Sequence, residues 1–202
     1  VAPHAKYPKI PNACYDFFRY ICDKCCDKKI YLGGASAGGN LALGVTMKLL
    51  ENNLTPAPLL LYYPNTSYLS ISDKEWDNSS LTLNFIDYAY ARNMYLKDGK
   101  KFDMRSPLCS PVLYDKFDDI KFPKCYMVIC KKVILIEQQE YIIDQIPNVT
   151  VDKFDYPHGF IIDLDQAKKS ITTKMKNFVE WFLSGIWPNV FLKNNRFKTY
   201  IY

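Results

Sequence analysis

The sequence predicts an α/β fold, a mostly parallel β-sheet whose faces are covered by helices. Two continuous apolar runs, residues 59–63 and 125–130, are typical of strands that are buried on both sides. Apolar residues also recur at helical spacing over residues 36–53 and 135–145, each time after or between such runs. Strands that alternate with helices favour a parallel sheet, because each connecting helix returns the chain across one face of the sheet.

The elements on either side of this core follow the same pattern. Residues 11–28 place their apolar side chains on one helical face, and Pro11 suits the first turn of that helix. Residues 30–32 predict a short buried strand, and residues 149–156 predict a strand with partial alternation. Residues 164–182 predict a final amphipathic helix.

The length and composition predict one globular domain. With 202 residues, of which 49% are hydrophobic and 23% charged, the chain can bury a sizeable core. The net charge of +5 comes from scattered lysines, which excludes the basic patch of a nucleic-acid-binding protein. No run approaches the ~20 apolar residues of a membrane span. About residues 65–105 lack a long periodicity, and we expect a cap-like insertion of short helices and loops there.

The seven cysteines do not form the pattern of a disulfide framework, because their number is odd and two of them lie in an apolar strand. Cys22, Cys25 and Cys26 lack the second ligand pair that a zinc site needs. The cysteines therefore favour packing roles and a reducing, cytoplasmic compartment.

A glycine-rich stretch, Gly-Gly-Ala-Ser-Ala-Gly-Gly-Asn at residues 33–40, connects the first strand to the second helix. A serine between a strand and a helix, with glycine two positions away on each side, is the pattern of a nucleophile elbow. We expect Ser36 to be the nucleophile and Gly34 and Gly38 to leave room for the sharp turn. The Ala37 N–H, at the helix N-terminus, would hold an oxyanion.

Two alternatives to the elbow are a turn that merely starts a helix and a cradle for phosphate. The stretch lacks the Lys-Ser/Thr ending of a P-loop and the spacing of a dinucleotide-binding fingerprint. A nucleophilic serine also needs a base, and the chain has only two histidines. His4 precedes the elbow in a proline-rich segment, whereas His158 follows the last strand, where sites of α/β proteins form. We therefore expect His158 to be the base; the alternative is an ordinary surface turn.

These motifs together resemble the hormone-sensitive-lipase-like branch of the α/β-hydrolases, which includes the arylacetamide deacetylases. The elbow resembles that branch's Gly-Asp-Ser-Ala-Gly-Gly-Asn, with Ala35 in place of the usual aspartate. Further motifs match in the same order, from residue 1 to about residue 185: Ala2-Pro3, Tyr62-Tyr63-Pro64, Ser110-Pro111 and His158-Gly159-Phe160.

The chain departs from the family pattern in two places. The family's His-Gly-Gly oxyanion stretch and the early strands would lie before residue 1, so we expect a carboxyl-terminal part of a longer protein or a decayed remnant. The family's Asp-x-Leu-x-Asp pattern falls on Val133, Leu135 and Glu137. Valine cannot orient an imidazole, so Glu137, one helical turn further on, is the candidate acid; the alternative is a solvated surface carboxylate.

The resemblance implies hydrolysis of carboxylic esters with a small or medium acyl group. Ser36 would attack, His158 would transfer the proton, and the Ala37 N–H would stabilise the oxyanion. No cofactor or metal is implied, and the expected partner is a small-molecule ester. The alternative is a catalytically inactive binding or scaffolding protein. Without the early strands the sheet would expose an apolar edge, so we also expect the isolated chain to associate, with a homo-oligomer as one form.

Overall fold

The fold is known from a computed structural model that describes most of the chain. The residues outside the description are 1, 70–82, 84, 97–103, 118–121 and 161–202. The predicted helix at residues 164–182 falls in the last of these ranges. The chain divides into two compact units, residues 1–159 and residues 160–202, and the fold below is that of the first unit.

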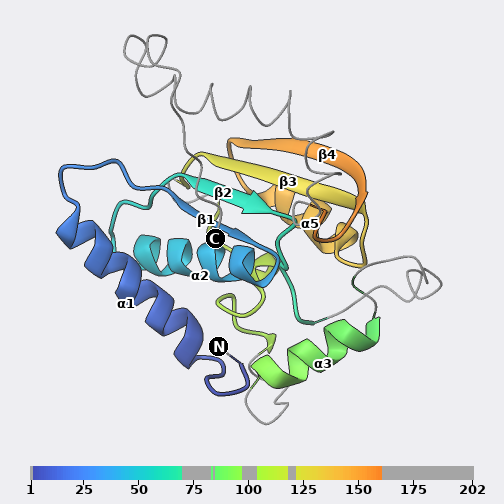
Figure 1. The fold of residues 1–202 in the computed structure, drawn as a ribbon. Helices are drawn as coiled ribbons and strands as arrows, with labels where there is room; N and C mark the ends of the chain where they lie inside the picture. The colour runs from blue at the N-terminus through green and yellow to red at the C-terminus, as the bar shows by residue number, and fades with distance from the viewer. Residues whose placement is uncertain (1, 70–82, 84, 97–103, 118–121, 161–202) are drawn as a thin grey trace. The chain divides into compact units, whose positions relative to one another are not determined.

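Four parallel strands form the sheet in the order β1-β2-β3-β4 (Figure 1). The strands are β1 (Leu32–Ala35), β2 (Leu59–Tyr62), β3 (Cys125–Lys132) and β4 (Val149–Pro157). The helices are α1 (Lys9–Lys24), α2 (Ala37–Glu51), α3 (Phe85–Tyr95) and α5 (Ile136–Gln145), with a 3-10 turn, η3 (Pro111–Leu113). Each described strand except the last is followed by a helix, and the predicted parallel α/β architecture is confirmed.

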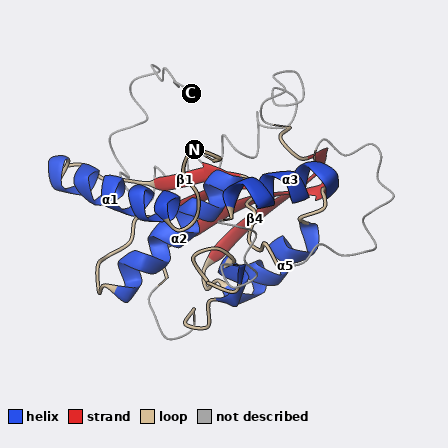
Figure 2. Ribbon diagram, turned by 90° about the horizontal axis from the view of Figure 1, so that it is seen from below, coloured by secondary structure: helices blue, strands red, loops and turns tan. Residues whose placement is uncertain are grey.

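The main core lies between one face of the sheet and the helices α2 and α5, which Figure 2 shows in front of the strands. Leucines of β2 and alternate residues of β3 meet apolar side chains of both helices. The members that are fully buried are Leu43, Met47, Leu59, Leu61, Met127, Ile129 and Ile142. All six residues from 125 to 130 are buried, as the continuous apolar run predicted.

Helix α1 packs on α2 and is joined to it by a second, smaller cluster. Tyr15 and Phe18 of α1 contact Val45 and Leu49 of α2. The helix begins at Lys9, so that Pro11 lies in its first turn as predicted. It ends at Lys24, four residues earlier than the sequence pattern suggested, because residues 26–29 are exposed and have no apolar face to bury.

The prediction of a strand before the elbow is confirmed, but its position at residues 30–32 and its burial are wrong. The strand β1 begins at Leu32 and runs through Gly33 and Gly34, with half-buried and exposed residues alternating. The backbone of β1 lies close to β2 at Gly33, and a side chain would not fit there. A Cβ on Gly33 would be 2.8 Å from the carbonyl oxygen of Leu60. Among the described strands, β1 and β4 form the edges. The expected self-association through an exposed edge stays a prediction.

The segment from residue 65 to residue 105 contains α3, whose tyrosines stack on the chain around it. Tyr68 lies between Tyr88 and Tyr95, with ring centroids 6.1 Å and 5.2 Å away. The cap-like insertion and the single-domain organisation stay predictions. No helix in the described ranges has the length and apolar character needed to cross a membrane.

Candidate active site

Ser36 occupies a strained turn between β1 and α2. Its φ of 54° and ψ of −117° lie in a region that residues other than glycine rarely adopt, at a cost of about 1–3 kcal/mol. Backbone hydrogen bonds on both sides hold the turn. The Ser36 N–H donates to the carbonyl of Tyr62 (2.9 Å), and the Ser36 carbonyl accepts from the N–H groups of Asn40 (3.2 Å) and Asn65 (3.0 Å). These three hydrogen bonds therefore keep Ser36 in its strained conformation.

Of the two glycines expected to leave room beside Ser36, the structure confirms one. A Cβ on Gly34 would lie 2.3 Å from the carbonyl carbon and oxygen of Gly38, so Gly34 is required for the turn to close. A Cβ on Gly38 would meet nothing within 4 Å, so the prediction that Gly38 itself must be small is wrong. Gly39 carries that constraint instead, because its Cβ would lie 2.7 Å from the Pro64 side chain.

His158 comes directly after β4 and meets Ser36 across 122 residues of sequence. Its Nε2 lies 2.8 Å from Ser36 Oγ. The ring of Tyr63, the residue after β2, contacts the imidazole edge-on, with centroids 4.7 Å apart and planes at 61°. The structure therefore brings together the two side chains that the sequence singled out as nucleophile and base.

Burial lowers the pKa of His158 from 6.5 to about 4. The imidazole is accordingly neutral at physiological pH, which is the form that can accept a proton. In the tautomer with its proton on Nδ1, Nε2 accepts a hydrogen bond from the Ser36 hydroxyl.

The same pKa predicts a loss of stability in acid. The unfolded chain binds a proton at His158 near pH 6.5 and the folded chain only near pH 4, so stability decreases as the pH falls between these values. We expect this histidine alone to account for about 3 kcal/mol of the loss over that interval. Urea unfolding at several pH values, compared between the unmodified chain and His158→Asn, measures it. Parallel pH profiles in the two proteins would contradict the assignment.

The two positions considered for the acid lie in different surroundings. Lys132 of β3 pairs with Pro157 of β4, so Val133 and His158 are the next residues along two adjacent strands. The Val133 side chain is buried and apolar. Glu137 lies in the first turn of α5, exposed, and makes no hydrogen bond or ion pair in the described part of the chain.

The oxyanion position expected near Ala37 lies at the start of α2. Ala37 is the first residue of this helix, so its N–H has no acceptor within the helix and lies at the positive end of the helix dipole. The chain has no glycine before Gly33, and so no His-Gly-Gly stretch precedes the elbow in this sequence.

Asn40, a residue that the sequence did not single out as functional, connects the elbow to two other segments. The side chain is 1% exposed, and its Nδ2 donates to the carbonyls of Asn65 (3.0 Å) and Cys109 (2.9 Å). Its position as the last residue of the glycine-rich stretch was the one signal that could have identified it. A buried amide with two carbonyl acceptors stabilises the loops that surround Ser36.

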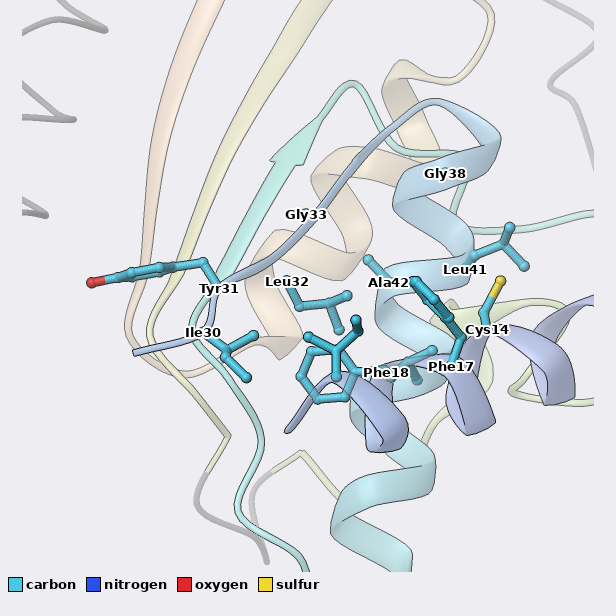
Figure 3. A pocket seen from close by; sticks show the side chains of 12 residues that line it. Cys14, Phe17, Phe18, Ile30, Tyr31, Leu32, Gly33, Gly38, Leu41 and Ala42 are labelled. Carbon is cyan, nitrogen blue, oxygen red and sulfur yellow. The ribbon is translucent and has the colours of Figure 1, made fainter. Parts of the chain in front are cut away.

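Two apolar cavities flank the elbow helix. Figure 3 shows the larger one, about 400 Å³, which lies between α1, β1 and α2 and is walled by side chains such as Phe17, Leu32 and Leu41. The other, about 370 Å³, includes Ala37 in its wall and is otherwise mostly aromatic and aliphatic. Its remaining lining residues are Ala2, Pro3, Ile10, Asn40, Leu41, Tyr68, Tyr90, Ala91, Met94 and Tyr95.

The cysteines are free thiols, and the described residues contain no cluster of three metal-ligating side chains. Cys125 and Cys130 lie inside β3, where burial raises the pKa of both to about 12. They therefore remain protonated at neutral pH and behave as small apolar residues.

The chain is similar to known proteins over most of its length. A family model described as the α/β-hydrolase fold matches residues 1–160. Vegetative-specific protein H5 of Dictyostelium discoideum is 27% identical over 224 residues, which cover 98% of this chain and 64% of that protein.

Solved structures show the same fold. ESTFA in its iron-lacking apo form superposes with a TM-score of 0.71 at 25% identity, over 84% of this chain and 58% of that one. Carboxyl esterase 2 of the fungus Tuber melanosporum gives 0.71 at 20% identity, over 79% and 56%. The carboxylesterase EstE1, from a metagenomic library, gives 0.73 at 18% identity, over 85% and 63%.

The chain thus spans less than two thirds of the length of each of these relatives. The match to the family model covers β1 to β4 and includes both Ser36 and His158. The chain belongs to the α/β-hydrolase fold family, in its hormone-sensitive-lipase-like branch.

Proposed function

We propose that this protein hydrolyses carboxylic esters, with Ser36 as nucleophile and His158 as general base. The observation that carries the proposal is the 2.8 Å contact between Ser36 Oγ and His158 Nε2 on a strained elbow. Nucleophile and base within hydrogen-bond distance are the requirement for activating a serine hydroxyl.

The proposed reaction has two halves. As Ser36 Oγ attacks the acyl carbon, its proton moves to His158 Nε2, and the carbonyl oxygen becomes an oxyanion beside the Ala37 N–H. His158 then gives the proton to the departing alkoxide, which leaves as the alcohol. A water molecule, deprotonated by His158, hydrolyses the acyl-serine and releases the acid.

Two proteins of the same fold that are carboxylesterases support an ester as substrate. Carboxyl esterase 2 and the carboxylesterase EstE1 share the fold of this chain. The cavity of about 370 Å³ beside Ala37 is apolar and of limited volume, which supports a small or medium acyl or alcohol group. We propose Glu137 as the candidate acid, because it lies four residues beyond Val133; α5 begins only at Ile136, so the two residues do not share a helical face.

A second candidate function is that of a catalytically inactive binding or scaffolding protein. One observation favours it: the buried valine at position 133, which follows Lys132, the strand partner of Pro157. A valine in place of the acid would lower the rate of ester hydrolysis without removing the apolar cavity.

A fluorophosphonate probe distinguishes the two functions. We expect labelling at Ser36 as the only modified serine, because the probe reacts with an activated hydroxyl, and we expect Ser36→Ala to abolish it. Ser106→Ala is the matched control, since it removes a serine hydroxyl that accepts a hydrogen bond from Tyr7 away from the elbow. Labelling identified by mass spectrometry at another serine, or persisting in Ser36→Ala, would remove the nucleophile assignment.

A further inference from the structure

The loop after β2, residues 63–67, touches both members of the proposed catalytic pair. Tyr63 lies edge-on to the His158 imidazole, and the Asn65 N–H donates to the Ser36 carbonyl at 3.0 Å. Tyr63 has a φ of 36°, a conformation that a tyrosine holds only when its neighbours constrain it. The position of this loop therefore affects the position and the burial of both side chains.

The first turn of α5 holds this loop through two glutamines. Gln138 Oε1 accepts hydrogen bonds from the backbone N–H groups of Thr66 and Ser67, both at 2.6 Å. Thr66 Oγ1 donates in turn to the Gln138 carbonyl at 2.9 Å. Gln139 is fully buried, and its Nε2 donates to the Pro64 carbonyl at 3.0 Å.

We infer that Gln138 is a positioning residue for the Ser36–His158 pair, acting through the loop at residues 63–67 and the ring of Tyr63. The inference rests on the proposed function, because it takes Ser36 and His158 to be the catalytic pair. Gln138 lies in the first turn of α5, next to Glu137, and its hydrogen bonds in the described part of the chain are to Thr66 and Ser67, so it is not itself catalytic.

The chemistry of the side chain explains why an acceptor is needed at position 138. The N–H groups of Thr66 and Ser67 are buried with their residues, and one amide oxygen satisfies both. Without that acceptor, the loop must open until water reaches the two N–H groups. The ring of Tyr63 would then withdraw from His158 and let water approach the imidazole.

Hydration of the imidazole would change the pKa of His158 in a known direction. Burial is what lowers the pKa of His158, so loosening the loop must raise that pKa back towards 6.5. Tyr63 is the titratable residue in ring contact with His158, and burial raises its own pKa to about 12, so it stays neutral throughout. The charged residues at the ends of the neighbouring strands, Lys132 and Asp155, form an exposed pair with each other.

The experiment titrates the two histidines of the full chain by NMR, with His4 as the internal reference. We expect Gln138→Met, which keeps the length of the side chain but removes the acceptor, to raise the pKa of His158 by about one pH unit or more. In assays with 4-nitrophenyl acetate it should lower kcat about tenfold, with little change in KM. Glu140→Met, on the same helix, is the control and should leave the His158 pKa and kcat unchanged.

A double-mutant cycle tests the route through Tyr63. In Tyr63→Leu, adding Gln138→Met should not move the His158 pKa further, because the contact through which Gln138 acts is already lost. Additive shifts, or an unchanged His158 pKa in folded Gln138→Met, would overturn the inference. If Gln138→Met does not fold, Thr66→Val removes the hydroxyl contacts to the carbonyl and Oε1 of Gln138, leaves the backbone hydrogen bonds in place, and should shift the pKa in the same direction. Equal hydrolysis by the unmodified chain and Ser36→Ala would refute the proposed function, whereas the titration would still decide the positioning role.

Discussion

Val133→Asp is expected to raise kcat for a small activated ester by up to about 10⁴-fold, the factor that a serine protease loses when the acid of its triad is replaced. Residues 133 and 158 directly follow the paired residues Lys132 and Pro157, and an aspartate at position 133 would accept the Nδ1–H and stabilise the imidazolium that forms as Ser36 attacks. The gain should appear in kcat more than in KM, because the charge develops in the transition state.

Val133→Asn is the matched control for this substitution. Asparagine has nearly the same size and polarity as aspartic acid but carries no charge, so it should recover little of the gain. The carboxylate should also raise the pKa of His158 above its value of about 4, which would move the acid limb of the kcat/KM profile to higher pH. An aspartate variant that folds but hydrolyses no faster than the asparagine variant would contradict the role of position 133.

Glu137→Gln in the unmodified chain completes the comparison. If Glu137 is the working acid, removing its charge lowers kcat by a large factor. The interpretation that residue 133 occupies the position of the acid is then wrong. If Val133 occupies the acid position, Glu137→Gln changes little in either background. Rates equal to those of Ser36→Ala in every variant would favour the inactive binding protein.

Gly34→Ala is expected to destabilise the fold on the order of 3 kcal/mol and to abolish labelling of Ser36. The added Cβ would lie 2.3 Å from the backbone of Gly38, and a main-chain atom cannot move aside without displacing the start of α2. The loss would be measured as the change in the free energy of unfolding in urea, together with the fluorophosphonate assay.

Gly38→Ala is the control for this prediction, since the same methyl group meets nothing within 4 Å there. Its stability should stay within about 1 kcal/mol of the unmodified chain, because alanine also favours the helix that begins beside it. Equal losses in the two variants would show that the elbow does not depend on the close approach of Gly34 to Gly38.

Patterns that are local in the sequence were sufficient to predict the order of strands and helices and the elbow. Helical spacing and continuous apolar runs depend on neighbouring residues only, and β2, β3, α2 and α5 lie within a few residues of their predicted positions. The glycine-rich stretch identified Ser36 in the same way. His158 was predicted from its order in the chain rather than from any contact, because order along parallel strands indicates which ends meet at one edge of the sheet.

Other features depended on which segments meet in space. The requirements for glycine at positions 33 and 39 arise from contacts with Leu60 and Pro64, more than 20 residues away. The low pKa of His158 comes from burial. The hydrogen bond from the Thr66 N–H to Gln138 joins residues that are 72 positions apart in the sequence. The sequence by itself determined the helices and strands and the chemical groups that they carry. Only the tertiary structure decided the distances between these groups, their burial and their hydrogen-bond partners from distant segments. These depend on packing between segments that no local pattern in the sequence relates.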